Sequence, residues 1–120
     1  MIKVIPMTEE YIDDVAEIDE HCFHVPWTRT DFEREIRENK LAIYFVAVNE
    51  DNKAVGYAGM WHVVNEGHIT NVAVLESYRR MGIGDMLMEA LEERGLELEM
   101  IGITLEVRIS NYGAQKLYTK

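Results

Sequence analysis

The densest run of apolar residues lies in the middle of the chain. Leu41–Val48 is almost continuously apolar, which predicts a central strand buried on both faces of a sheet. Ala54–Val64 and His68–Val74 predict two further strands, separated by short polar segments. Gly56 and Gly59 mark points where the second strand bulges or where another group approaches its backbone. We expect the three strands to form an antiparallel meander.

Helical spacing dominates the segments that precede this meander. Thr8 can cap a helix that carries its apolar residues on one stripe and ends near His21. A second, shorter helix is predicted to run to about Glu38. It would begin with a capping box in which Thr30 caps the helix and Glu33 stands at its third position. Two helices are therefore expected before the central strand.

Further strands and helices are predicted toward both ends of the chain. Lys3–Pro6 reads as a short first strand that the proline ends. Gly84–Arg94 has helical spacing, and Gly95 is a natural residue to end that helix. Gly102–Arg108 alternates apolar and polar residues, and a strand that follows a helix crossover should run parallel to the strand before it. A last helix is predicted over residues 112–119.

Length, composition and charge bound the class of protein. The chain has 120 residues, of which 48% are hydrophobic. We expect one α/β domain over residues 1–120, with a central, mostly antiparallel sheet, one parallel strand pair and flanking helices. The net charge of −10 argues against nucleic acid as a partner and suits a cationic one. Cys22 is the only cysteine, which indicates a reducing, cytoplasmic location, and no apolar run approaches the ~18 residues of a membrane span.

The most informative stretch joins the third strand of the meander to the helix after it. Arg79, Gly82 and Gly84 stand in the spacing Arg-x-x-Gly-x-Gly at the start of that helix. The first N–H groups of a helix lack partners within it, and with the positive end of the helix dipole they form an anion site. Glycine leaves the backbone open to an anion, and Arg79 and Arg80 add charge. The stretch lacks the Walker and dinucleotide signatures, and a turn without a ligand is the alternative.

This strand, loop and helix resemble the pyrophosphate loop of the GNAT acetyltransferase superfamily, whose cosubstrate is acetyl-CoA. The resemblance implies that two parallel strands splay there, so that the backbone N–H of Val74 faces the acetyl carbonyl. Asp85 stands where the family often has a basic or neutral residue, and its charge is expected to weaken binding. No metal is implied. The implied cofactor-binding residues are Val72, Ala73, Val74, Arg79, Arg80, Met81, Gly82, Ile83, Gly84 and Asp85, with Asn111 and Tyr118 from a second motif.

That second motif adds the chemistry. Leu105–Tyr118 resembles the pattern Leu-Glu-Val-Arg-x-Ser-Asn-x-x-Ala-x-x-Leu-Tyr of RimI-type enzymes, which acetylate protein N-termini. The resemblance implies that Glu106 is the general base for the acceptor amine and that Tyr118 is the general acid for the departing thiolate. Asn111 matches a CoA-contacting residue. Each of these residues also has a purely structural alternative. Glu106 could face solvent or pair with Arg108, Tyr118 could pack the last helix against the sheet, and Asn111 could cap that helix.

The segment between the first two helices carries a third match. Phe23, Pro26 and Trp27 fit the Phe-x-x-Pro-Trp-Ser/Thr segment of RimI-type enzymes, and the resemblance implies that they wall the groove for the acceptor substrate. The alternatives are a loop that is simply pinned to the core, and a His-Cys-x-His metal cluster at 21–24, which lacks a second ligand pair nearby. His62 and His68 are rival bases, but His68 lies about 20 Å along its strand from Val74 and is expected to be structural.

The sequence departs from the RimI-type pattern at its C-terminal end. Family members continue past the last helix with a Gly-Phe turn and a final hairpin, whereas this sequence stops at Lys120. We expect the lack of this hairpin to leave a strand edge or an apolar face exposed and so to favour a homodimer. Acetyl-CoA binding should survive the loss better than turnover does.

Taken together, the resemblance predicts an acetyl-CoA-dependent N-acetyltransferase that modifies the α-amine of a protein N-terminus, such as that of a ribosomal protein. Transfer is expected to be direct, within a ternary complex, because Cys22 lies in the first helix–loop region and is poorly placed for an acetyl-cysteine route. Two alternatives remain at this point. The acceptor could be a small amine, such as a polyamine or an amino acid, or the domain could bind CoA without turnover.

Overall fold

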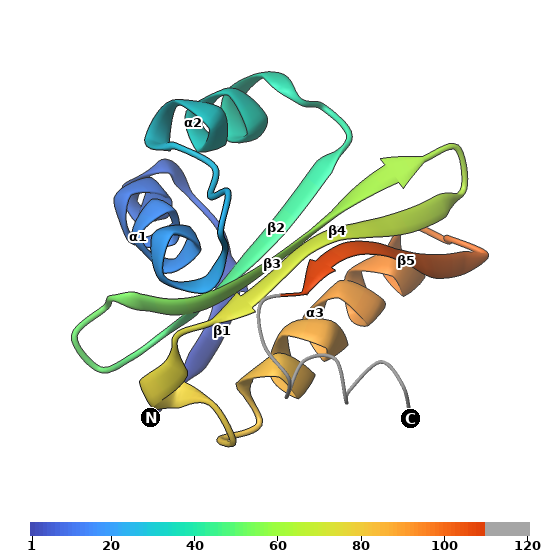
Figure 1. The fold of residues 1–120 in the computed structure, drawn as a ribbon. Helices are drawn as coiled ribbons and strands as arrows, with labels where there is room; N and C mark the ends of the chain where they lie inside the picture. Colours follow the sequence, from blue (N-terminus) through green and yellow to red (C-terminus); the bar gives the residue numbers. More distant parts are fainter. Residues whose placement is uncertain (110–120) are drawn as a thin grey trace.

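A mixed sheet forms the centre of the fold in the computed structural model, which describes residues 1–109 and their side chains as far as Leu105. Within residues 1–109, five strands pair in the order β1-β2-β3-β4-β5 (Figure 1). The meander of β2, β3 and β4 is antiparallel and β5 pairs parallel to β4, both as the sequence predicted, and β1 pairs antiparallel to β2. The elements are β1 (Lys3–Pro6), η1 (Glu9–Tyr11), α1 (Ile12–Cys22), α2 (Arg29–Glu38), β2 (Ala42–Val48), β3 (Ala54–Val63), β4 (Glu66–Val74), η2 (Glu76–Tyr78), α3 (Ile83–Glu97) and β5 (Gly102–Ile109).

Helices cover both faces of this sheet, with α1 and α2 on one face and α3 on the other (Figure 1). Each face therefore has its own apolar core. β2 contributes Tyr44, Val46 and Val48 to the core under α1 and α2, and Ala47 to the core under α3. The prediction that the central strand is buried on both faces is thus confirmed. Within residues 1–109, no helix has the length and apolar character that crossing a membrane requires.

Gly59 fulfils both roles that its position in the strand predicted. The pairing of β3 with β4 shifts register between Gly59 and Met60, which is the signature of a bulge. A Cβ atom at Gly59 would overlap the ring of Tyr44, which lies flat against the backbone there. The missing side chain therefore makes room for a buried aromatic ring.

The first helix begins later than its predicted cap. The Thr8 side chain makes no capping hydrogen bond, and its hydroxyl instead donates to the Glu10 carboxylate at 3.3 Å. A 3-10 turn intervenes before α1 begins at Ile12. This turn buries the Tyr11 ring while its hydroxyl donates to the Asn52 side chain at 2.6 Å. The packing of Tyr11 therefore overrides the cap signal at Thr8.

The second helix begins two residues earlier than predicted, because its capping box uses Thr28 and Asp31 and not Thr30 and Glu33. The Asp31 N–H donates to Thr28 Oγ1 at 3.1 Å, and the Thr28 N–H donates to Asp31 Oδ2 at 2.9 Å. The hydrogen bond from the Thr28 backbone N–H to the Asp31 carboxylate, followed by one from the Thr28 side chain, lowers the pKa of Asp31. Glu33 instead pairs with the Arg29 guanidinium at 2.9 Å. The prediction that Thr30 caps the helix was therefore wrong, because the pair of Thr28 and Asp31 satisfies the same motif two residues earlier.

The third helix does not end at Gly95, as its glycine suggested, but continues to Glu97. Gly95 lies on the same buried stripe as Leu87 and Leu91, at intervals of four residues. A Cβ atom at Gly95 would stand 3.2 Å from Cδ1 of Ile103 in β5. Gly95 therefore serves the close packing of α3 on β5, and the prediction that it ends the helix was wrong.

The hairpin between β3 and β4 is tighter than predicted. Val63 pairs with Glu66, so β4 begins two residues before His68 and the turn consists of Val64 and Asn65. Val64 is 89% exposed and has a φ of 57°. Residues with a β-branched side chain rarely adopt this left-handed conformation. The turn therefore forms against the preference of one of its two residues.

Candidate functional site

The loop after β4 leads into a helix N-terminus that no described side chain caps. Gly82 takes the cap position with a φ of 79°, which glycine adopts without strain. The first helical bond runs from the Met86 N–H to the Gly82 carbonyl at 3.0 Å. The N–H groups of Ile83, Gly84 and Asp85 therefore lack acceptors within the helix. A Cβ atom at Gly82 would meet nothing within 4 Å, so the loop is open on that side of Gly82.

The two arginines of this loop are placed differently. Arg79 is half-buried, and its Nε donates to the Val74 carbonyl at 3.0 Å while its Nη2 lies 3.6 Å from Cys22 Sγ. It therefore ties the end of β4 to the end of α1. Arg80 is exposed and has a φ of 68°. Arg80 is thus the more solvent-exposed cation of the loop, whereas the Arg79 guanidinium is held against Val74 and Cys22.

The backbone of Val74 turns toward the β5 side of the sheet. The Leu75 N–H donates to the Val55 carbonyl at 2.9 Å, and the hydrogen-bonding direction alternates along an antiparallel strand. The Val74 N–H must therefore point away from β3. The described pairing of β4 with β5 reaches only as far as Val72, opposite Ile109. The Val74 N–H lies beyond this last described pair, where the resemblance expects it to face an acetyl carbonyl.

The strand β4 is irregular on both sides just before this point. On the β3 side, β4 carries Thr70 as an extra residue. On the β5 side, the register shifts between Ile69 and Asn71, opposite the part of β5 that contains Glu106 and Val107. Bulges bend a strand and are frequent beside active sites. The strand position of Glu106, the candidate base, thus falls beside this irregular part of β4.

The catalytic roles expected from the second motif remain predictions. The side chain of Glu106 and the whole of Asn111 and Tyr118 lie outside the described residues. The rival base His68 stands near the start of β4, where its Nδ1 lies 3.4 Å from Thr104 Oγ1. It is therefore at the opposite end of the strand from the phosphate loop, as expected.

The loop between α1 and α2 is pinned to the core. Phe23 and Trp27 pack against the core under α1 and α2, and the Trp27 ring lies 5.1 Å from that of Phe32. The Trp27 N–H donates to Asp19 Oδ2 at 2.9 Å, while Pro26 is half-buried beside it. Among the described residues, no three His, Cys, Asp or Glu side chains gather as a metal site requires. The role of this loop as an acceptor wall stays a prediction.

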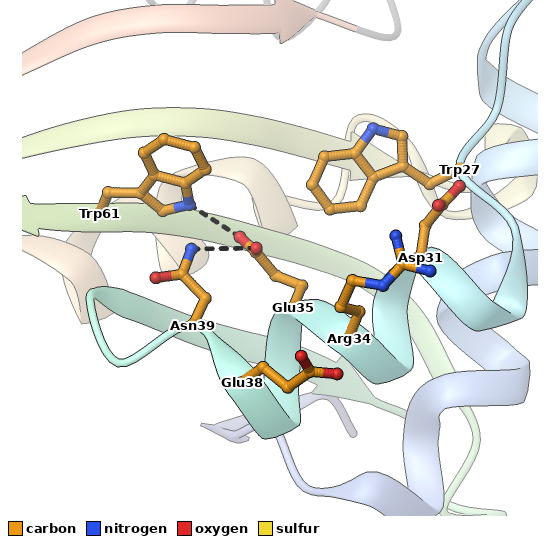
Figure 2. A pocket seen from close by; sticks show the side chains of 7 residues that line it. All are labelled: Trp27, Asp31, Arg34, Glu35, Glu38, Asn39 and Trp61. Carbon is orange, nitrogen blue, oxygen red and sulfur yellow. Dashed lines mark hydrogen bonds between the residues drawn. The ribbon is translucent and has the colours of Figure 1, made fainter.

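A groove of about 600 Å³ opens next to this loop, between α2 and the end of β3 (Figure 2). Trp27 and Trp61 supply two indole rings, and α2 supplies the facing polar side chains. Three carboxylates and one guanidinium line the groove, so its net charge is negative. The complete lining is Trp27, Asp31, Arg34, Glu35, Glu38, Asn39 and Trp61.

Glu35 is the buried centre of this groove, and the sequence reasoning missed it. Its Oε2 accepts from Trp61 Nε1 at 2.7 Å and its Oε1 accepts from Asn39 Nδ2 at 3.0 Å (Figure 2). Oε2 also accepts from the Tyr44 hydroxyl at 2.9 Å. These bonds orient the Trp61 indole and tie α2 to the sheet. The available signal was its spacing, because Glu35 follows the buried Phe32 by three positions and so lies on the inward face of the helix.

A second buried network under the loop was also missed. The Tyr57 hydroxyl donates to Asp19 Oδ1 at 2.5 Å, and the Tyr57 hydroxyl oxygen accepts from Asn71 Nδ2 at 3.2 Å. All three residues are at most 1% exposed. The sequence signals were an acid four positions after Val15 on the apolar stripe of α1, and an amide within an otherwise apolar strand.

The comparisons with known sequences agree with this geometry. The acetyltransferase (GNAT) family matches residues 12–120. The chain is 40% identical over 114 residues to a putative [ribosomal protein bS18]-alanine N-acetyltransferase of Bacillus subtilis, an alignment that covers 95% of this chain and 75% of that protein. It is 39% identical over 102 residues to an N-alpha-acetyltransferase of Saccharolobus solfataricus, covering 74% of this chain and 60% of that protein.

The fold is also found among solved structures. The PaiA N-acetyltransferase of Thermoplasma acidophilum, solved in complex with coenzyme A, superposes with a TM-score of 0.85 at 14% identity. The match covers 99% of this chain and 87% of that one, and at this identity it shows the fold alone. Sequence and fold together show that the chain belongs to the GNAT family of acetyltransferases, in its RimI-type branch.

Proposed function

We propose that this chain is an acetyl-CoA-dependent N-acetyltransferase that acts on the α-amine of a protein N-terminus. The observation that carries the proposal is the uncapped N-terminus of α3 behind the left-handed Gly82, at the end of a bulged β4. Three backbone N–H groups and the exposed Arg80 supply the donors and the charge that a diphosphate needs. The open space at Gly82 admits such a group. The residues present therefore fit the phosphate portion of acetyl-CoA.

The proposed acceptor follows from the relatives and from the groove. The Bacillus subtilis relative is named for acetylation of an alanine of ribosomal protein bS18, and the archaeal relative is named an N-alpha-acetyltransferase. The groove beside Trp27 has the volume of a typical ligand site and a negative lining. An extended, positively charged N-terminal segment can occupy such a groove beyond the amine itself. A protein N-terminus therefore suits this face better than a small diffusible amine does.

The chemistry requires three groups of this chain. Bound acetyl-CoA supplies an acetyl group that is activated as a thioester. Glu106 is assigned to take a proton from the acceptor amine, whose nitrogen then forms the new C–N bond. The Val74 N–H donates to the carbonyl oxygen while negative charge develops on it. Tyr118 gives its proton to the sulfur as the C–S bond breaks, and it regains a proton from solvent, to which Glu106 releases the one it took.

Two measurements test this proposal. Isothermal titration gives the affinity for acetyl-CoA. A thiol-release assay follows turnover with each of two acceptors, a peptide whose first residue is alanine and the small amine spermidine. We expect binding, and release with the peptide. Release with spermidine alone would instead support a small-amine acceptor, and binding without any release would support a CoA-binding domain that lacks turnover.

Glu106→Gln isolates the proposed base. At neutral pH we expect turnover to fall by about 100-fold or more, because a positioned base contributes on that order, while the affinity for acetyl-CoA stays unchanged. Glu92→Gln, an exposed carboxylate on α3, is the matched control and should leave turnover intact. Wild-type turnover in Glu106→Gln would remove Glu106 from the base role.

A further inference from the structure

We propose that Asp19, Tyr57 and Asn71 form a buried brace that sets the position of the acceptor wall relative to the bulge of β4. The inference rests on the proposed function, because it gives these residues a role in placing the acceptor amine. They do not touch the reacting atoms in this scheme. They are positioning residues that act through Trp27 at one end and through β4 at the other.

The brace is a continuous chain of hydrogen bonds through the protein interior. It begins at the Trp27 N–H, which donates to Asp19 Oδ2 at 2.9 Å. The other carboxylate oxygen accepts the Tyr57 hydroxyl proton at 2.5 Å, and the Tyr57 oxygen accepts from Asn71 Nδ2 at 3.2 Å. The chain thus joins the loop after α1 to β3 and then to β4. Asp19 and Tyr57 are fully buried, and Asn71 is 1% exposed.

The aromatic packing holds the central hydroxyl in place. The Tyr57 ring meets the Phe32 ring edge-on at 5.6 Å and lies nearly parallel to the Tyr44 ring at 6.2 Å. With its ring fixed on two sides, Tyr57 cannot follow Asp19 or Asn71 if either moves. These groups are buried, so water does not readily replace a hydrogen bond that is broken between them, and breaking one is costly. The network therefore resists changes in the separation of its two ends.

The two ends of the brace are the parts of the site that must be held at a fixed separation. Trp27 belongs to the candidate acceptor wall and lines the groove in Figure 2. Asn71 directly follows Thr70, the extra residue of β4, opposite the part of β5 that contains Glu106. A shift of the wall relative to this bulge would move the acceptor amine relative to its base. A displacement of this kind by about 1 Å can cost on the order of 100-fold in rate.

The position of the brace also predicts that its loss affects the use of the acceptor peptide and not the binding of acetyl-CoA. Tyr57 lies in the core under α1 and α2, whereas Ile83 and Leu87 of the phosphate-loop helix lie in the core on the opposite face. Loss of the Tyr57 hydroxyl should therefore loosen the acceptor side and leave the cofactor side unchanged. A residue with a purely structural role would lower stability without separating the two substrates.

The test compares Tyr57→Phe with Tyr11→Phe. Tyr11 is also buried in the core under α1 and α2. Its hydroxyl, however, donates at 2.6 Å to Asn52 in the β2–β3 turn, which belongs neither to the acceptor wall at Trp27 nor to the bulge of β4. Kinetics are measured with an alanine-starting peptide, acetyl-CoA affinity by titration, and stability by urea unfolding. In Tyr57→Phe we expect kcat/KM for the peptide to fall about tenfold, the size expected from one buried hydrogen bond, with acetyl-CoA affinity within about twofold. In Tyr11→Phe both values should stay at wild-type levels. An unchanged kcat/KM for the peptide in Tyr57→Phe, or equal losses for both substrates, would overturn the proposal.

Amide hydrogen exchange provides a readout that does not depend on turnover, and its first measurement uses the wild-type protein alone. In the wild-type protein the Trp27 amide should exchange slowly, at the rate of core amides, although it lies in a loop. Exchange at the rate of an exposed loop amide would overturn the brace. If the wild-type protein acetylates no acceptor, the proposed function fails, and exchange alone then judges the brace. Faster Trp27 exchange in Tyr57→Phe but not in Tyr11→Phe supports it, and equal exchange in all three proteins overturns it.

Discussion

Val64 holds a backbone conformation that its own side chain opposes. Its φ of 57° lies in the left-handed region, where a residue with a Cβ atom pays roughly 1–2 kcal/mol. The side chain is 89% exposed, so no packing offsets this cost. Asparagine tolerates the left-handed region and is common in tight hairpin turns. We expect Val64→Asn to raise the free energy of unfolding by about 1 kcal/mol in urea denaturation.

Val64→Thr separates the conformational effect from the loss of an exposed apolar group. Threonine keeps the β-branch and therefore the strain, but it is polar. Its free energy of unfolding should remain within about 0.5 kcal/mol of the wild type, as for most surface substitutions. Equal gains in both variants would show that exposure of the apolar side chain, and not backbone strain, limits stability at this turn.

At the scale of single elements, the cap of α2 decides between two sequence patterns. Thr28→Ala removes the hydroxyl that accepts the Asp31 N–H, and it should cost about 1 kcal/mol of unfolding free energy, a typical value for an N-cap. Thr30→Ala alters a residue inside the first turn, where alanine is the better helix former, and should be neutral or slightly stabilising. Thermal or urea unfolding of the two variants measures the difference. The reverse order would place the cap at Thr30.

The same cap makes the stability of α2 depend on pH. Hydrogen bonds from Thr28, chiefly from its backbone N–H, lower the pKa of Asp31 in the folded protein. A carboxyl with a lowered pKa stabilises the fold at pH values above its ordinary pKa. This contribution is lost as the pH falls through the lowered value, because the proton must then be accepted in the folded state. An NMR titration should therefore find Asp31 titrating below its ordinary value of 3.8, and Thr28→Ala should move it upward.

The N-terminus of α3 carries a charge that serves the helix but opposes its proposed ligand. Asp85 lies in the first turn, where a negative charge interacts favourably with the helix dipole. A bound diphosphate would repel it. Asp85→Asn should therefore tighten acetyl-CoA binding by roughly two- to fivefold, which corresponds to about 0.3–1 kcal/mol, while slightly lowering the stability of the ligand-free protein. Isothermal titration and urea unfolding measure the two effects.

Glu92→Gln is the control for net charge in this comparison. Glu92 is exposed on the same helix, about two turns further along, and its removal changes the net charge by the same amount. Because such interactions fall off beyond the first turn and are screened by salt, we expect less than about a twofold change in affinity. Equal tightening in both variants would indicate that the overall charge of −10, and not the helix N-terminus, governs binding.

For the molecule as a whole, the sequence predicted the sheet better than it predicted the connections between layers. The meander and the parallel strand follow from apolar runs and short turns, which are local signals. Asp19 and Tyr57 meet across 38 residues, and Glu35 and Trp61 across 26, so no local pattern pointed to either bond. Gly82 was identified from the local spacing Arg-x-x-Gly-x-Gly, whereas Gly95 was misassigned as a helix end because glycine also permits close packing. Self-association stays a prediction, since residues beyond 109 are not described.

The proposed phosphate site can be tested by measuring how much bound acetyl-CoA raises the unfolding free energy of the protein. The helix that begins at Gly82 packs Ile83, Leu87 and Leu91 into one of the two cores, so a ligand held there binds only the folded chain. At a concentration of 100 times its Kd, acetyl-CoA should add about 2.7 kcal/mol to the unfolding free energy. For a chain of 120 residues, this corresponds to a rise in Tm of about 10 °C.

Acetylated pantetheine at the same concentration is the matched ligand for this experiment, because it keeps the thioester and lacks the diphosphate. It should produce a much smaller shift, since the N–H groups after Gly82 would then have no anion to bind. Equal shifts for the two ligands would mean that the thioester arm alone supplies the affinity. The helix N-terminus would then be an ordinary solvated helix end, and the diphosphate contact would have to be abandoned even if acetyl transfer itself were observed.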